Sequence, residues 1–210
     1  MPTHTTSSDD TVWQACLLAI VGGYADAVGV LNFNAFAGAM TGNTVLLGIA
    51  LATGKFVDAA QSAAIIAAFL VGVAASALLR RWLSLAAIIV IETVAIVMAA
   101  LMTLPFATSL MLAFAMGLQN AALQHSAGAS VNTVFVTGNL NKLIQVLLGG
   151  KARRTAEHAA VRAASHVWMA YLAGAVLGAA ASQWRPHPLL FALLPLPLVL
   201  LRRSAWRAGD

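Results

Sequence analysis

The chain is poor in charged residues. Asp, Glu, Lys and Arg make up 9% of its 210 residues, whereas hydrophobic residues make up 60%. A soluble domain carries about 25% charged residues, so this chain has too few of them to cover a globular surface. The composition therefore predicts a protein whose solvent is the lipid bilayer, and it excludes fibrous and disordered classes.

Cysteine is nearly absent, and the usual enzyme motifs are missing. Cys16 is the single cysteine, which excludes a disulfide within the chain and a cysteine-based metal cluster. The sequence contains no His-Glu-x-x-His, no Gly-x-Ser-x-Gly, no phosphate loop and no dinucleotide loop. We therefore predict a protein that is not an enzyme and that has no cofactor and no metal site.

The net charge of +5 does not indicate a nucleic-acid partner. The basic residues stand in short clusters between apolar segments, such as Arg80-Arg81 and the KARR run at 151–154. No basic face carries the aromatic residues that stack on bases. This distribution is typical of a membrane protein that faces anionic lipid, so membrane lipids are the predicted partners.

Long apolar runs predict an all-α polytopic membrane protein, because a spanning helix needs about 20 mostly apolar residues. Two shorter runs would rise only about 20 Å as helices, which is short for a hydrocarbon core of about 30 Å. We expect about six transmembrane helices plus two short or re-entrant ones. The six lie near 12–32, 59–80, 83–104, 106–126, 160–182 and 187–203, and the short ones near 42–54 and 137–149.

The two halves of the chain resemble each other. GYADAVGVLNFNAFAGAMTGN from Gly23 parallels GLQNAALQHSAGASVNTVFVTGN from Gly117, and farther on AAFLVGVAASALL parallels MAYLAGAVLGAAAS. We interpret this as an internal duplication of one membrane unit. The predicted organisation is a polar N-terminal tail, two half-repeats and a C-terminal tail, at 1–10, 11–105, 106–204 and 205–210.

Whether the short segments span the membrane or re-enter decides the orientation of the halves. If they re-enter, each half has three spans and the halves are inverted. If they span, each half has four and the halves point the same way. The positive-inside rule favours six spans with both termini cytoplasmic, because that parse leaves only Lys55 and Arg185 outside.

Two Thr-Gly-Asn runs stand at the start of the short segments, and we interpret each as a turn that breaks the chain. Gly would permit the turn while Thr or Asn caps the helix; alternatively, the positive helix ends face a solute or an ion. The candidate binding residues in these runs are Thr41, Gly42, Asn43, Thr44, Thr137, Gly138 and Asn139.

Polar residues inside the apolar segments are the other candidates. Asp26 is either a proton- or cation-binding carboxylate or an acceptor for backbone N–H groups at 41–44, and Asn120 holds the matching place in the second half. Glu92 needs a partner from another helix or must be protonated. Gln124, one turn after Asn120, and Asn32, beside the break, fit either interhelical hydrogen bonding or contact with a polar solute.

The first-half stretch GYADAVGVLNFNAFAGAMTGNTVLLGIAL resembles the signature of the YoaK family of bacterial multi-pass membrane proteins. The residues that carry this resemblance are Gly23, Asp26, Ala27, Phe36, Met40, Thr41, Gly42, Asn43, Thr44 and Gly48, and GLQNA with the second TGN resembles the family's second half. The resemblance covers about residues 13–203. It implies a location in the bacterial inner membrane and no established activity.

Two functional hypotheses follow. The first is a small transporter or permease-like protein for a small polar solute or a proton, with its site at the Thr-Gly-Asn turns, Asp26 and Asn120. The alternative is a structural, regulatory or assembly protein that does not transport, in which the small-residue helix YLAGAVLGAAAS forms an association surface. A homodimer is compatible with a chain of 21.7 kDa.

Overall fold

The computed structural model describes residues 8–126, 154–184 and 187–201, and these are helical throughout apart from short connections. No strand occurs among them, which confirms the all-α prediction. The helices are α1 Ser8–Phe33, α2 Met40–Ala52, α3 Phe56–Leu79, α4 Leu85–Leu101, α5 Pro105–Ser126, α7 Arg154–Trp184, the 3₁₀ helix η3 Pro188–Leu193 and α8 Leu196–Leu201.

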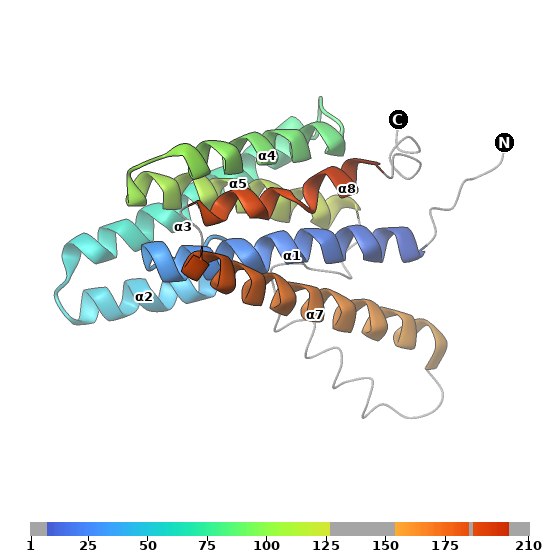
Figure 1. The fold of residues 1–210 in the computed structure, drawn as a ribbon, viewed down its shortest axis with the longest axis horizontal. Coiled ribbons are helices and arrows are strands. Elements are labelled where there is room, and N and C mark those ends of the chain that lie inside the picture. The colour runs from blue at the N-terminus through green and yellow to red at the C-terminus, as the bar shows by residue number, and fades with distance from the viewer. Residues whose placement is uncertain (1–7, 127–153, 185–186, 202–210) are drawn as a thin grey trace.

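The long helices lie roughly along one axis and alternate in direction (Figure 1). α1 and α7 run one way, and α3 and α5 run the other way. α4 returns beside α5, and η3 followed by α8 makes the last passage. As a result α1 begins, and α8 ends, at the same end of the bundle.

The short helix α2 does not cross the bundle. It has 13 residues and packs against α3, which has 24. At about 1.5 Å per residue, α2 covers about half the length of α3. Because α2 and α3 meet at the turn around Gly54 and Lys55, the first residue of α2 lies about halfway along α3. The chain therefore re-enters the bundle before α2 begins.

Glycines hold two helix pairs at close range, α1 with α7 and α3 with α5. A Cβ atom on Gly23 would overlap the carbonyl oxygen of Tyr171, and one on Gly174 would overlap that of Ile20. Likewise, Cβ atoms on Gly117 and Gly72 would overlap the carbonyl oxygens of Phe69 and Phe114. Small residues that allow backbones to approach are the usual basis of helix association in lipid.

The two crossings use matching positions of the sequence repeat. Gly23 pairs with Gly117 in the repeat, and Tyr171, in MAYLAG, pairs with Phe69, in AAFLVG. Gly23 faces the backbone of Tyr171, and Gly117 faces the backbone of Phe69, so equivalent glycines meet equivalent residues. The first helix of each half thus packs on the later helix of the other half, and the two pairs run in opposite directions (Figure 1). The predicted boundary between the half-repeats, at residues 105 and 106, lies at the start of α5.

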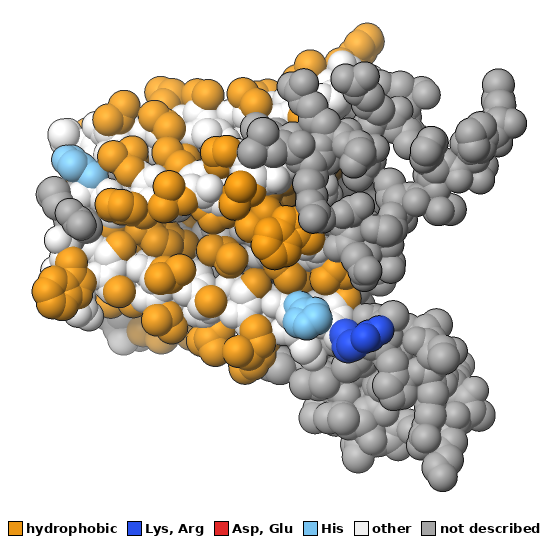
Figure 2. Space-filling view, turned by 45° about the vertical axis from the view of Figure 1, so that its right-hand side comes forward, with side chains coloured by type: hydrophobic (Ala, Val, Ile, Leu, Met, Phe, Trp, Pro, Cys, Tyr) orange, Lys and Arg blue, Asp and Glu red, His pale blue; other side chains and the backbone are white. Residues whose placement is uncertain are grey.

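The outer surface is that of a membrane protein. Among the described residues, Figure 2 shows hydrophobic side chains spread over one face, with Lys or Arg only at its margin. Leu70, Val94 and Val176 are about half exposed or more, and Trp82 and Trp184 stand out at helix ends, as aromatic residues do at the membrane interface. Three described helices are long and apolar enough to span a membrane, and 40–52, 85–101 and 188–199 are shorter apolar elements.

The predicted apolar segments correspond to helices with shifted ends. The run at 42–54 forms α2, and 137–149 lies outside the described residues. The last segment is divided, since η3 ends at Leu193 and α8 begins at Leu196. Pro195 stands between them, and it lacks the N–H group that a continuous helix would use.

We expect Gly23→Ala and Gly117→Ala to lower the melting temperature by similar amounts, because each added methyl must push two backbones apart. Overpacking of this kind costs about 1–3 kcal/mol. Gly48→Ala is the matched control, since no atom lies within 4 Å of its Cβ position. Thermal unfolding in detergent measures all three, and a control that melts as early as the other two would contradict the crossing geometry.

Candidate functional site at the chain break

The chain breaks between α1 and α2, at residues 34–39. α1 ends at Phe33, and Asn34 takes a left-handed conformation with φ of 53°, which Asn tolerates better than most residues. The Ala35 N–H then donates to the Gly29 carbonyl at 3.3 Å. A Cβ on Gly29 would lie 2.5 Å from the Ala35 carbonyl oxygen, so glycine lets the chain fold back along α1.

The prediction that Thr41-Gly42-Asn43 forms the turn is wrong. These residues lie in the first turn of α2, whose N-cap is Ala39. The predicted capping by Thr or Asn is wrong as well, because no side chain caps α2 at that position. The Asn-Ala-Phe-Ala-Gly-Ala stretch at 34–39 contains the small residues that the break requires, and the Thr-Gly-Asn run serves to hold it.

Asp26 holds the start of α2 from the side of α1. Its Oδ1 accepts hydrogen bonds from the N–H groups of Gly38, at 2.6 Å, and Ala39, at 3.2 Å. The carboxylate thus takes the place of a capping side chain and faces the positive end of the helix. Backbone acceptance was predicted at 41–44; the partners are instead the two residues immediately before α2. Asp26 is buried, and a carboxylate at such depth is tolerated when it is paired in this way.

Asn43 holds the middle of the break. Its Oδ1 accepts from the Phe36 N–H at 2.9 Å, and its Nδ2 donates to the Phe36 carbonyl at 2.8 Å. One fully buried amide therefore satisfies both backbone groups of a residue that has no helical partner. The ring of Phe36 lies over Gly42, where a Cβ would be 2.5 Å from it. These contacts explain why glycine and asparagine follow each other here.

Tyr171 ties the break to α7. Its hydroxyl donates to Asp26 Oδ2, so the carboxylate accepts bonds from its own half and from the other half. Sequence reasoning missed this residue. The available signal was the repeat itself, because Tyr171 adds a hydroxyl where the first half has Phe69, and a buried hydroxyl needs a partner.

The α3–α5 crossing differs from the α1–α7 crossing at the matching positions. Asn120 of α5 stands where α1 has Asp26, and Phe69 of α3 stands where α7 has Tyr171, so the α3–α5 crossing lacks the carboxylate and the hydroxyl. Asn120 is buried, and its Oδ1 has no hydrogen-bond partner among the described residues. Gln119 beside it donates from Nε2 to the Leu18 carbonyl at 3.0 Å and so joins α5 to α1.

The other predicted site residues are dispersed. Asn32 donates to Ser182 Oγ at 3.0 Å on an exposed part of the α1–α7 seam. Thr41 and Thr44 are exposed on α2. Glu92 is fully buried in α4, and neither of its oxygens has a hydrogen-bond partner within the described segments. The side chain of Gln124, and Thr137, Gly138 and Asn139, lie outside the described residues.

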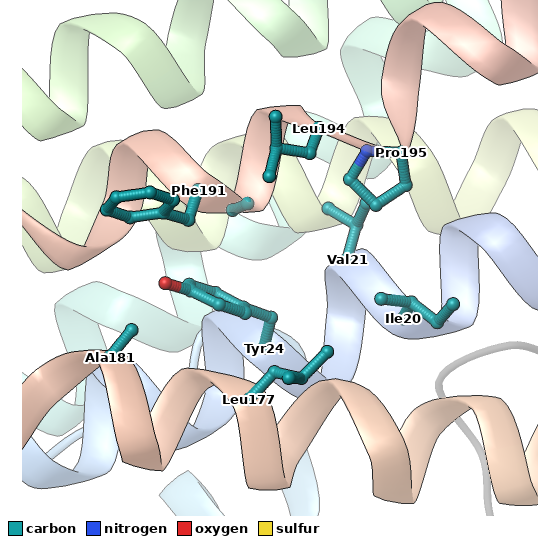
Figure 3. A pocket seen from close by; sticks show the side chains of 9 residues that line it. Ile20, Val21, Tyr24, Leu177, Ala181, Phe191, Leu194 and Pro195 are labelled. Atoms are coloured by element: carbon teal, nitrogen blue, oxygen red, sulfur yellow. The ribbon is translucent and has the colours of Figure 1, made fainter.

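An apolar crevice lies on the opposite side of α1, between α7 and η3 (Figure 3). Its volume is about 250 Å³, and Ile20, Leu177, Phe191 and Pro195 are among the residues that line it. The one polar group drawn in it, the Tyr24 hydroxyl, donates to the Pro188 carbonyl at 2.5 Å. The described residues that line this crevice are therefore mostly apolar.

Comparison with protein families gives one match, to the family described as Protein of unknown function (DUF1275), over residues 14–202. The chain belongs to this family. The match agrees with the resemblance to the YoaK family and covers both halves, including Asp26, Tyr171 and the chain break. Comparison with curated proteins and with solved structures finds no match.

We expect Asp26→Ala to destabilise the protein more than Asp26→Asn does. Alanine leaves the N–H groups of Gly38 and Ala39 unpaired, at about 1–3 kcal/mol for each buried donor, whereas the amide oxygen of asparagine can still accept both. Tyr171→Phe, which removes one donor and keeps the ring, should have a smaller effect than Asp26→Ala. Melting temperatures in detergent give the order, and an Asp26→Ala variant as stable as the unmodified protein would contradict the capping role.

Proposed function

We propose that this membrane protein moves a small polar solute across the bacterial inner membrane. The observation that carries the proposal is the start of α2 halfway along α3, held by a buried carboxylate of another helix. Non-helical backbone at membrane depth is tolerated where protein buries it or where it lines a wet cavity. Discontinuous helices of this kind form the central sites of many transporters.

The two glycine-packed pairs support a rocking mechanism. Each pair is held together by direct backbone contact, whereas α1 and α5, which belong to different pairs, meet through side chains, by apolar packing and by the Gln119 hydrogen bond. The pairs run in opposite directions, as the halves of an inverted repeat do. We propose that the pairs act as two rigid bodies and that the solute passes between them.

Asp26 acts in this proposal as a positioning residue. Three donors already occupy its oxygens, two from the backbone and one from Tyr171. If protons are coupled to transport, Glu92 is the better carrier, because its oxygens have no partners among the residues described. Asp26 would then fix the geometry of the break, and Glu92 would respond to the proton gradient.

The proposed orientation places the start of α1 and the end of α8 in the cytoplasm. Arg80 and Arg81 follow α3 at that end of the bundle, and Lys55 precedes α3 at the other. Basic residues are enriched on the cytoplasmic side of short loops, and the family resemblance implies the inner membrane.

The alternative, a non-transporting assembly protein, was based in part on the small-residue helix as an association surface. Gly174 and Gly178 of the small-residue helix face the backbone of α1 within the same chain. They are therefore not free to form the association surface that this alternative requires.

Cross-linking tests the rocking of the pairs. In a Cys16→Ser background, Leu18→Cys with Gln119→Cys joins the two pairs, and Asn32→Cys with Ser182→Cys joins α1 to α7 within one pair. A short, membrane-permeant bis-methanethiosulfonate is applied to proteoliposomes, because Leu18 and Gln119 are buried and its disulfide links can be reduced. Osmotic swelling with glycerol, urea, alanine and ethanolamine measures flux. We expect the first link to reduce flux at least about tenfold and the second to change it less than about twofold, because only the first blocks relative motion.

The single-cysteine variants control for misfolding, and cleavage of the link by a reductant should restore flux. Swelling that matches protein-free liposomes for all four solutes would contradict transport of these solute types. Flux that survives the Leu18–Gln119 link would contradict the rocking mechanism.

A further inference from the structure

Figure 1 shows that α3 and α5 begin at the end of the bundle where α1 ends. A second cavity is lined by residues from these helix ends. Its volume is about 330 Å³, which is at the low end of the range of small-molecule sites. It differs from the apolar crevice because polar side chains supply much of its wall. Asn34, Asp58, Gln61, Ser62 and Ser109 line it together with apolar residues of α1, α3 and α5.

One face of α3 provides most of the polar lining. Asp58, Gln61, Ser62 and Ile65 follow at spacings of three and four, so they lie on the same side of the helix. Asp58 is the one charged group among the lining residues. Asp58 lies in the first turn of α3, where a negative charge interacts favourably with the helix dipole. The dipole does not explain why Gln61 and Ser62, one turn later, line the same cavity.

The cavity borders directly on the chain break. Asn34 and Ala35 line it, and these two residues start the segment that Asn43 and Asp26 hold. Ser109 lines the cavity from α5. α5 and α3 form one helix pair, whereas Asn34 and Ala35 follow α1, which belongs to the other pair. A solute bound here would touch both pairs and the broken segment, as a transported solute must.

We infer that this cavity binds a small hydroxylated or otherwise polar ammonium solute, an assignment that rests on the proposed transport function. The Asp58 carboxylate supplies the countercharge, and the amide and hydroxyl groups of Gln61 and Ser62 supply hydrogen bonds. The cavity volume of about 330 Å³ limits the solute to about ten heavy atoms, since one water takes about 30 Å³ of liquid volume.

Thiol protection tests the site with defined probes. Ser62→Cys in a Cys16→Ser background places one nearly isosteric thiol on the cavity wall. It is labelled in proteoliposomes with a cationic or an anionic methanethiosulfonate, with ethanolamine or its neutral analogue ethylene glycol as competitor. Thr53→Cys, at the same end of the bundle and outside the lining, is the control position.

We expect the cationic reagent to be favoured at least about threefold over the anionic one at Ser62→Cys, after correction for their intrinsic rates, because one nearby negative charge attracts it. Ethanolamine should slow labelling saturably and ethylene glycol should not. Asp58→Asn should remove both effects, and Asp58→Glu, which keeps the charge, should retain them. Labelling at Thr53→Cys should not respond to ethanolamine.

Rapid labelling without charge preference and without protection would overturn the inference and leave a merely hydrated cavity. Equal protection by ethylene glycol would overturn the ammonium assignment. Flux measured in the same vesicles separates the two proposals. Protection without flux supports the site and contradicts transport, whereas ethanolamine flux that Asp58→Asn leaves unchanged supports transport and overturns the site.

Discussion

The architecture depends on the hydrogen bonds between Asp26 and the two residues that precede α2. Without them, the positive end of a 13-residue helix would lie inside an apolar bundle with unpaired N–H groups. Asn43 then pairs both backbone groups of Phe36, and Tyr171 occupies the second carboxylate oxygen. Three side chains, from α1, α2 and α7, thus supply the hydrogen bonds that the polar groups of the break require.

The two glycine-packed helix pairs, α1 with α7 and α3 with α5, are the second main feature of the fold. Gly23 and Gly117 occupy matching positions of the sequence repeat, and they meet the backbones of Tyr171 and Phe69, which also match. The side chains at the two crossings differ, since Asp26 and Tyr171 at one correspond to Asn120 and Phe69 at the other. One copy therefore carries a charged capping site, and the other presents a neutral amide at the equivalent depth.

Composition and length were sufficient to predict a helical membrane protein, because bilayer thickness fixes how long a spanning helix must be. Of the two predicted half-length segments, the first is α2, and the second lies outside the described residues. The repeat also indicated which residues would be equivalent. The position of the break was not predictable from the Thr-Gly-Asn run, because glycine and asparagine suit turns and also suit tight packing. Only the fold shows that Gly42 receives the Phe36 ring and that Asn43 pairs with the Phe36 backbone. Tyr171 was missed because its hydrogen bond to Asp26 joins helices distant in the chain.

The re-entry of α2 is the central claim, and cysteine accessibility tests it most directly. In a Cys16→Ser background, single cysteines at Trp13, Lys55 and Trp82, all exposed, are labelled in intact cells and in permeabilised cells with an impermeant thiol reagent. Re-entry predicts that positions 13 and 82 share one side of the membrane and that position 55 lies on the other. Positions 13 and 55 on the same side, with 82 opposite, would show that α2 spans the membrane and would contradict the account.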